Sequence, residues 1–156
     1  MNDLGPLVPD PSPRAPWLAS LAGYGQRFLG RMLDGVVFLA PILLWGFLLK
    51  DPARSAADSR MLLYLLTLSF SFLNDVVLTV LTGRSIGKMI TGTRVVLAQD
   101  HQPITIGPAL IRWFVIVVLS VIPFGGFIDA VFIFSGELRQ TLHDRAAGTL
   151  VFRVSV

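Results

Sequence analysis

Hydrophobic and polar positions form long alternating blocks along the chain, and three of the blocks are apolar. Residues 28–49 and 61–82 each exceed the roughly 20 residues that a helix needs to cross a hydrocarbon core of about 30 Å. These two blocks predict two full transmembrane helices, and we expect Pro41 to kink the first. The short polar segment 50–60 between them predicts a loop that joins antiparallel neighbours.

The third apolar block, residues 110–135, is interrupted by Pro-Phe-Gly-Gly at positions 123–126. Two structures fit this pattern: a broken third span, or a helical hairpin that enters and leaves on the same side. Cytoplasmic segments of membrane proteins are rich in lysine and arginine. With both chain ends in the cytoplasm, ten of the 13 cationic residues lie inside and three outside, which favours the hairpin. We therefore predict a multi-pass protein of the cell membrane with a cytoplasmic N-terminus and C-terminus.

The polar segments complete the expected architecture. Residues 1–16 contain five prolines and predict a disordered tail ahead of a single membrane domain, residues 17–156. Trp17 and Tyr24 lie in an amphipathic stretch and are candidate anchors at the membrane interface. A secretory signal is not expected, because the first residues lack its basic start and apolar centre.

Two short β-prone runs, residues 95–97 and 104–106, flank a polar turn and predict two short strands or extended pieces around it. A further β-prone run lies at 149–154. The expected fold is therefore all-α integral membrane, with a short extended element on the cytoplasmic face.

Composition supports this class and removes others. Hydrophobic residues make up 53% of the chain and charged residues 15%, against about 25% charged in soluble domains. The chain has no cysteine, and its two histidines have no metal-ligand spacing, so we expect no metal and no cofactor. Basic residues are not interleaved with aromatics, so the expected partners are the lipid bilayer and anionic lipid headgroups rather than nucleic acid.

Charged residues inside the apolar blocks are the main candidates for function. Arg27, Arg31 and Asp34 share one helix face, and Asp34 lies about 10 Å beyond Arg27. With the hairpin, Asp75 and Asp129 reach a similar depth, so three carboxylates form one layer that suits an ion or proton relay. The alternative is structural: a local Arg31–Asp34 salt bridge, with Arg27 extending to the headgroups.

The segment 83–88 has the pattern G-x-x-x-G-K, one residue short of a phosphate-binding loop, and Met89 replaces the required serine or threonine. We therefore reject nucleotide binding. Gly83 and Gly87 fit a helix end or a close helix approach better. The cations of this region are expected to face anionic headgroups; they are Arg84, Lys88 and Arg94.

The pair His143 and Asp144 invites an acid–base interpretation, but no nucleophile accompanies it, so we do not expect an enzyme. Asp144 is better explained as the N-terminal cap of a helix or as a partner for Arg84 or Arg112.

Three segments together, 27–34, 83–96 and 142–151, resemble the RDD family of membrane proteins, which is named for one arginine and two aspartates. The resemblance extends over residues 20–154, although the turn at 99–103 departs from the family pattern. It implies that Arg27 is the family arginine, with Arg31 as the alternative, and that Asp34 is the first aspartate, with Asp144 or Asp75 as the second. The other positions that carry the motifs are Gly83, Gly87, Lys88, Arg94, His143, Gly148 and Thr149.

The family resemblance implies transport, and in some members sodium/proton exchange. We therefore expect a small transporter or cation/proton exchanger, as a homo-oligomer or in a larger complex. Asp34 and Asp75 would carry the exchange, Arg27 and Arg31 would tune them, and Asp129 would assist. The alternative is an accessory subunit of a larger membrane complex, packed through small residues such as glycine. A weaker third alternative is lipid binding at the basic cytoplasmic surface.

Overall fold

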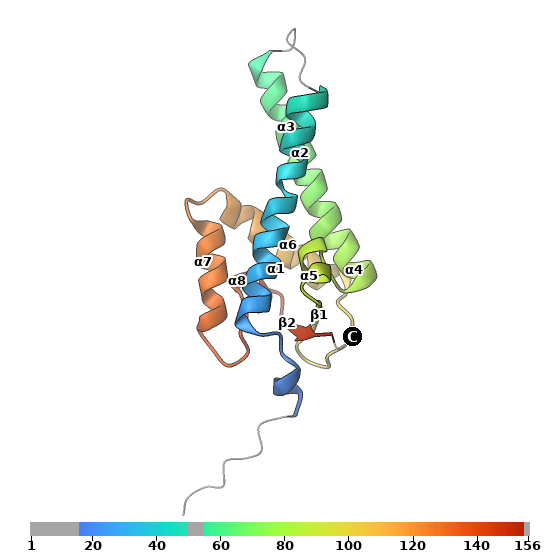
Figure 1. Ribbon diagram of the computed structural model, residues 1–156, viewed down its shortest axis with the longest axis vertical. Coiled ribbons are helices and arrows are strands. Elements are labelled where there is room, and N and C mark those ends of the chain that lie inside the picture. Colours follow the sequence, from blue (N-terminus) through green and yellow to red (C-terminus); the bar gives the residue numbers. More distant parts are fainter. Residues whose placement is uncertain (1–15, 50–54, 155–156) are drawn as a thin grey trace, which may run out of the picture.

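The computed structural model describes residues 16–49 and 55–154, which are mostly helical (Figure 1). The predicted disordered tail, residues 1–16, lies outside the described residues except for Pro16, which begins the short 3-10 helix η1 (Pro16–Ser20). Two long helical segments stand side by side as the tallest part of the molecule. The small sheet and the chain's last described residues lie at the opposite end from the tips of these segments.

The first long segment consists of α1 (Tyr24–Val37), α2 (Leu39–Leu44) and the π-helical turn η2 (Trp45–Leu49). The break between α1 and α2 falls at Phe38, three residues before Pro41. Proline has no N–H, so the carbonyl of Val37 loses its usual helical partner at this point. The expected interruption by Pro41 is therefore confirmed.

The second long segment consists of α3 (Ala56–Phe72), the π-helical turn η3 (Leu73–Leu78) and α4 (Thr79–Thr82). It begins five residues before the predicted start at 61, because the Ser55 hydroxyl accepts the Asp58 backbone N–H at 3.1 Å and caps the helix. It ends at Gly83, whose φ of +77° suits the residue after a helix.

Both long segments, Tyr24–Phe47 with 24 residues and Ala56–Thr82 with 27, are long and apolar enough to cross a membrane. Only 17% and 22% of their most apolar windows are buried inside the protein. A core helix of a soluble protein would be mostly buried, so the outward apolar side chains fit contact with lipid better.

The third apolar block folds as α6 (Ile106–Ser120) and α7 (Gly125–Val131), extended by η4 (Phe132–Phe134). The chain reverses between α6 and α7, and α8 (Leu142–Ala146) packs against both. A Cβ at Gly125 would overlap the Leu119 carbonyl, so glycine permits this tight turn. The geometry matches the hairpin alternative rather than one broken span.

The extended element is an antiparallel pair, β1 (Thr93–Leu97) with β2 (Thr149–Arg153), in which Val95 faces Val151. Of the two short strands or extended pieces predicted around the turn, 95–97 is confirmed as part of β1, whereas 104–106 is not a strand. Among the described residues, one isolated bridge, between Val96 and Pro103, forms on that side of β1. Pro103 has no N–H with which to extend a ladder, and α6 begins at Ile106.

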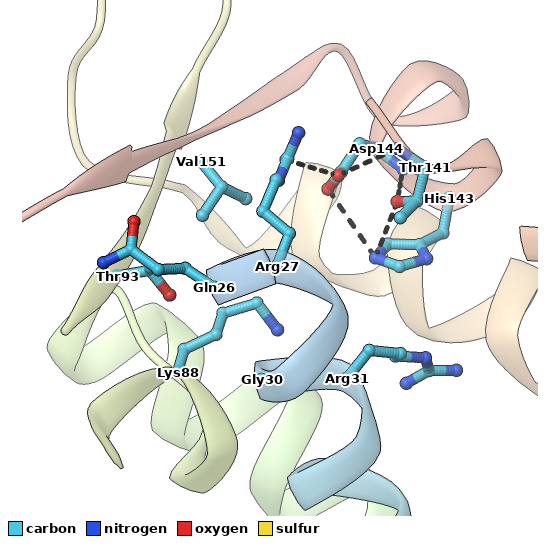
Figure 2. A pocket seen from close by; sticks show the side chains of 10 residues that line it. All are labelled: Gln26, Arg27, Gly30, Arg31, Lys88, Thr93, Thr141, His143, Asp144 and Val151. Carbon is cyan, nitrogen blue, oxygen red and sulfur yellow. Dashed lines mark hydrogen bonds and ion pairs between the residues drawn. The ribbon is translucent and has the colours of Figure 1, made fainter. Parts of the chain in front are cut away.

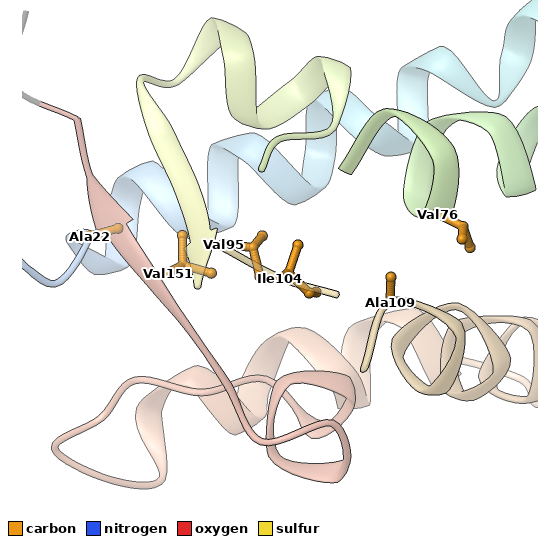
Figure 3. Close-up of a cluster of buried hydrophobic side chains, with 6 residues drawn as sticks. All are labelled: Ala22, Val76, Val95, Ile104, Ala109 and Val151. Atoms are coloured by element: carbon orange, nitrogen blue, oxygen red, sulfur yellow. The ribbon is translucent and has the colours of Figure 1, made fainter. Parts of the chain in front are cut away.

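Two buried clusters join the sheet to the helices. The larger one, in Figure 3, brings together side chains from the sheet, the second long segment and α6: Ala22, Val76, Val95, Ile104, Ala109 and Val151. The smaller one contains Leu21, Val96 and Leu150. The predicted interface anchors contact protein instead: Trp17 packs on His101 and Phe152, and Tyr24 stacks on Phe134 at 5.3 Å between ring centroids. Their role at a membrane interface stays a prediction.

The short helix α5 (Ile86–Ile90) lies directly against α1, at a crossing made by two glycines. A Cβ at Gly87 would overlap the Gly30 carbonyl oxygen and would lie 2.7 Å from the Asp34 carboxylate. A Cβ at Gly30 would lie 3.0 Å from the Thr91 hydroxyl. The expected close approach is therefore made by Gly87 with Gly30.

We expect Gly87→Ala to lower the free energy of unfolding by about 1–3 kcal/mol, because the added methyl group must move backbone rather than a side chain. Thermal unfolding in detergent measures the loss. Gly35→Ala is the matched control, since an added Cβ there meets no atom within 4 Å. Equal melting temperatures for the two variants would contradict the close contact.

Candidate functional site: two buried charge networks

The first network surrounds Asp34, whose side chain is fully buried. Its Oδ1 accepts the backbone N–H of Gly87 at 2.8 Å, and its Oδ2 accepts the Ser85 hydroxyl at 2.7 Å. The Lys88 ammonium lies 3.3 Å from the same Oδ2 and forms an ion pair with it. The glycine-lysine segment, which resembled a phosphate loop, thus encloses a carboxylate of the protein itself.

Two expectations about these cations are wrong. Lys88 does not face lipid headgroups, because it pairs with Asp34. Arg31 does not pair with Asp34 either; its Nε lies 3.7 Å from Asp129 Oδ2. The reason is tertiary: the contact between α5 and α1 brings donors from residues 85–88 to Asp34, so its local helical neighbour is not needed. Arg94 is exposed and Arg84 half-buried, and their predicted headgroup contacts remain untested.

Asp75 lies beside this network in the π-helical turn η3, where Asn74, Asp75 and Val76 are all buried. The wider turn of a π-helix lets neighbouring side chains point inward together. The Asn74 amide nitrogen lies 3.4 Å from Asp34 Oδ1 and 3.4 Å from Asp75 Oδ1. Asn74 therefore connects the two carboxylates.

On its other side, Asp75 Oδ2 accepts the Ser71 hydroxyl at 3.3 Å, and the Trp113 indole N–H donates to Ser71 Oγ at 3.0 Å. A line of polar groups thus runs from Trp113 through Ser71, Asp75 and Asn74 to Asp34. Within the described residues, Asp75 takes part in no ion pair.

The second network surrounds Asp144 in α8. Asp144 Oδ2 lies 2.8 Å from Arg27 Nη2, and Arg112 Nη1 contacts Oδ1. Arg112 also donates to Thr149 Oγ1 at 2.6 Å. The expected Asp144–Arg112 pair is confirmed. The expectation that Arg27 extends to the headgroups is wrong, because its guanidinium is buried against Asp144 (Figure 2).

Asp144 is not itself the helix cap. Thr141 is the cap of α8 and accepts the Asp144 backbone N–H at 3.2 Å, while Asp144 Oδ2 accepts the Thr141 backbone N–H at 3.2 Å. This reciprocal capping box aligns the carboxylate with the two arginines.

Asp129 is buried in α7 and belongs to the second network through His143. Its Oδ2 lies 2.7 Å from His143 Nδ1, and its Oδ1 accepts the His143 backbone N–H at 3.1 Å. The other ring nitrogen of His143 lies 3.1 Å from Thr141 Oγ1. Of the three carboxylates expected in one layer, only Asp34 and Asp75 share a bridging group; Asp129 instead orients His143.

Residues of both networks line one small cavity of about 20 Å³, shown in Figure 2. Lys88 reaches it from the first network, and Arg27, His143 and Asp144 reach it from the second. This volume is sufficient for about one water molecule, which needs roughly 10–15 Å³. A water molecule in this cavity could therefore hydrogen-bond to both networks and connect them.

Two side chains of α8, Asp144 and His143, have pKa values that differ from those of free side chains. Burial opposes ionisation of Asp144, but Arg112 and Arg27 outweigh it and hold the pKa of that carboxyl well below its usual range. Burial lowers the pKa of His143, and the nearby carboxylates do not offset this. At neutral pH the ring is therefore neutral, with Nδ1–H donating to Asp129.

Both pKa shifts predict that the protein loses stability on acidification. Each group has a lower pKa folded than unfolded, so the unfolded chain binds more protons as the pH falls. For His143 the loss begins near its ordinary pKa of 6.5, and Asp144 adds a second loss below 3.8. We expect the melting temperature in detergent to be level above pH 7 and to fall from there to pH 5.

His143→Gln should flatten the upper part of this pH profile, and His101→Asn should retain it. His101 is a suitable control because it is the chain's other histidine and its φ of +60° is one that asparagine tolerates. An unchanged profile in His143→Gln would rule out His143 as its source.

The fold and the buried charges define a small helical membrane protein whose polar end is held by arginine–aspartate and lysine–aspartate pairs. The family model described as RDD family matches residues 21–148, so the chain belongs to the RDD family, a membrane family. No curated protein and no solved structure matches the chain.

The geometry bears on the choice of the second family aspartate. Asp144, not Asp75, contacts Arg27, and Asp34 lies in the other network. Several polar partners were not among the predicted site residues: Ser71, Asn74, Ser85, Trp113 and Thr141. Asn74, next to Asp75 in an apolar block, and Thr141, three residues before Asp144, carried a usable sequence signal.

Proposed function

We propose that this protein exchanges a cation for protons across the membrane, with Asp75 as the carboxylate that binds each in turn. One observation carries the proposal. Asp34, Asp75, Asp129 and Asp144 are the buried aspartates of the described residues, and Asp75 alone among them is in no ion pair.

A carboxylate that is already paired with a cationic side chain is stabilised little further when it binds a proton or a free cation. Lys88 holds Asp34, and two arginines hold Asp144. Asp75 receives only the neutral donors Ser71 and Asn74, at 3.3 and 3.4 Å. An unpaired buried charge is costly, so a proton or an entering cation would stabilise Asp75.

The surroundings of Asp75 support access from one side. Ser71 lines a cavity of about 660 Å³ formed by residues of α1, α3 and α6, and its hydroxyl donates to Asp75. Toward the polar end, Asn74 connects Asp75 to Asp34, and the Asp34 partner Lys88 borders the small cavity. Polar groups thus extend from Asp75 through Asn74 to Asp34 on one side, and Ser71 connects Asp75 to the larger cavity on the other.

This proposal gives each charged residue a separate role in exchange, whereas the sequence placed them together in one relay. Asp75 carries the exchange. Asp34 anchors α5 and orients Asn74, and Asp129 orients His143, so these two position other groups. Arg31, which pairs with Asp129, would tune the site through its positive charge.

The proposal is tested by proton release from purified protein in weakly buffered detergent. Addition of sodium or potassium chloride, but not choline chloride, should release protons from the native protein. Asp75→Asn should abolish this release. Asp58→Asn should retain it, because Asp58 is exposed and bonded to Ser55 at the start of α3. Release that persists in Asp75→Asn would sink the proposal.

The accessory-subunit alternative also has an observation in its favour. Within the described residues, an added Cβ at Gly35 or Gly46 meets no atom within 4 Å, so both glycines leave room for the helix of a partner. A folded native protein that neither releases protons nor transports, but co-purifies with a larger membrane protein, would favour this alternative.

A further inference from the structure

Two apolar cavities meet at one arginine inside the helical part of the protein. The larger cavity, about 660 Å³, lies along α3 and α6, and a second of about 440 Å³ lies along α1 and α7. Arg31, Phe38 and Gly126 line both. The remaining lining is mostly apolar, with side chains such as Leu68, Val117 and Val121 in the larger cavity.

Arg31 has unused hydrogen-bonding capacity at this junction. Among the described residues it forms one ion pair, the 3.7 Å contact of Nε with Asp129, and its side chain is 20% exposed. Within the described residues its two terminal nitrogens make no hydrogen bond. A guanidinium presents five N–H donors in a planar fork that matches a carboxylate or a phosphate.

The position of Arg31 sets what kind of anion can reach it. Arg31 lies seven residues after the start of α1, about 10 Å along the helix. At that depth in an apolar surrounding, guanidinium N–H groups that have no acceptor are costly. An inorganic anion would have to leave water to reach it, whereas the head of an amphiphile can be drawn in by its chain.

We propose that this junction binds an anionic amphiphile, with its carboxylate or phosphate head on Arg31 and its acyl chain in the larger cavity. The cavity volume lies within the range of about 300–1,000 Å³ typical of sites for small ligands. This inference does not depend on cation exchange at Asp75, but an acyl chain in the larger cavity would compete with a cation that enters along Ser71.

A second copy of the chain is a poorer match for the site. Of the described acidic residues, only Asp58, Asp100 and Glu137 are exposed. Asp58 lies at the far end of α3, and the other two lie outside the long helical segments. The described helices therefore offer no exposed carboxylate at the depth of Arg31, and a lipid-like molecule would supply the acceptor for its terminal N–H groups.

The test uses the full chain in nanodiscs of zwitterionic lipid. Three probes carry the same diazirine group on the acyl chain: a fatty acid, a phosphatidylglycerol and a phosphatidylcholine. We expect an anionic probe to label peptides that contain Leu68, Val117 or Val121 in preference to phosphatidylcholine. Labelling by the fatty acid identifies a carboxylate head, and labelling by phosphatidylglycerol a phosphate head.

Two variants with matched controls test the two parts of the site. Arg31→Gln should lower the labelling at least about tenfold, since a hydrogen bond to a charged group is lost; Arg60→Gln, on an exposed residue of α3, should not. Leu68→Trp fills the cavity and keeps Arg31, so it should also abolish labelling. Leu65→Trp, on the same helix but outside the cavity lining, should retain it.

Two results would overturn the inference. Equal labelling by all three probes, unchanged in Arg31→Gln, would show bulk lipid only. Cross-links between two chains through the cavity residues, in place of lipid labelling, would show an interface between copies.

Discussion

Replacing Asp144 with asparagine is expected to lower the free energy of unfolding by about 3–5 kcal/mol, the largest stability loss that we expect from one substitution. Asp144 is the shared partner of Arg27 and Arg112, and all three side chains are buried. Asparagine is similar in size but uncharged, so it leaves two arginines buried without their counter-charge. Thermal unfolding of the detergent-solubilised protein, followed by size-exclusion chromatography after heating, measures the loss.

Glu137→Gln is the control, because Glu137 is exposed and makes no ion pair within the described residues. A second arm removes one of the stranded cations. Arg112→Gln combined with Asp144→Asn should be less unstable than the sum of the single changes, since one of the two unpaired cations is gone. Native-like melting of Asp144→Asn would contradict the view that this network holds α8 against α1 and α6.

Replacing Asp75 with asparagine is expected to abolish exchange while the protein stays folded. Asp75 has no ion pair within the described residues, so its neutralisation strands no cation. Asparagine can still accept the Ser71 hydroxyl. Asp34→Asn should behave differently and cost about 1.5–3 kcal/mol of stability, because it weakens a charged partner of Lys88, Ser85 and Gly87.

This contrast distinguishes a working carboxylate from a structural one. Melting temperature and cation-dependent proton release are measured on the same preparations of the native protein and both variants. A stable but inactive Asp75→Asn, beside an unstable Asp34→Asn, is the expected pattern. The opposite pattern would return the exchange role to Asp34.

The helical part of the fold was predictable because apolar runs of membrane length leave few alternatives. The break near Pro41 and the reversal at 123–126 also follow from local chemistry, since proline and glycine act on their own neighbours. The partner of β1 was not predictable in this way. The sequence indicated β-prone runs at 95–97 and 149–154 without a pairing between them, and these two distant runs form the sheet. Packing around Val95, Ala22 and Val151 decides this pairing.

The charged site shows the same limit more clearly. Helix periodicity correctly placed Arg27, Arg31 and Asp34 on one face, yet each takes its partner from elsewhere in the chain: Asp144, Asp129 and Lys88. Spacing along a helix identifies which side chains are neighbours on that helix. A buried charge, however, needs a counter-charge, and here a different packed element supplies it. The π-helical segment η3 buries both Asn74 and Asp75, and no sequence pattern predicted a π-helix at this position.

The most direct test of the account is cation-driven proton flux in proteoliposomes loaded with a pH-sensitive dye, with native protein, Asp75→Asn and Asp58→Asn reconstituted at equal density. The account predicts that an inward sodium or potassium gradient drives proton efflux with the native protein and with Asp58→Asn, and none with Asp75→Asn. Absence of flux with folded native protein, or flux that survives in Asp75→Asn, would contradict it.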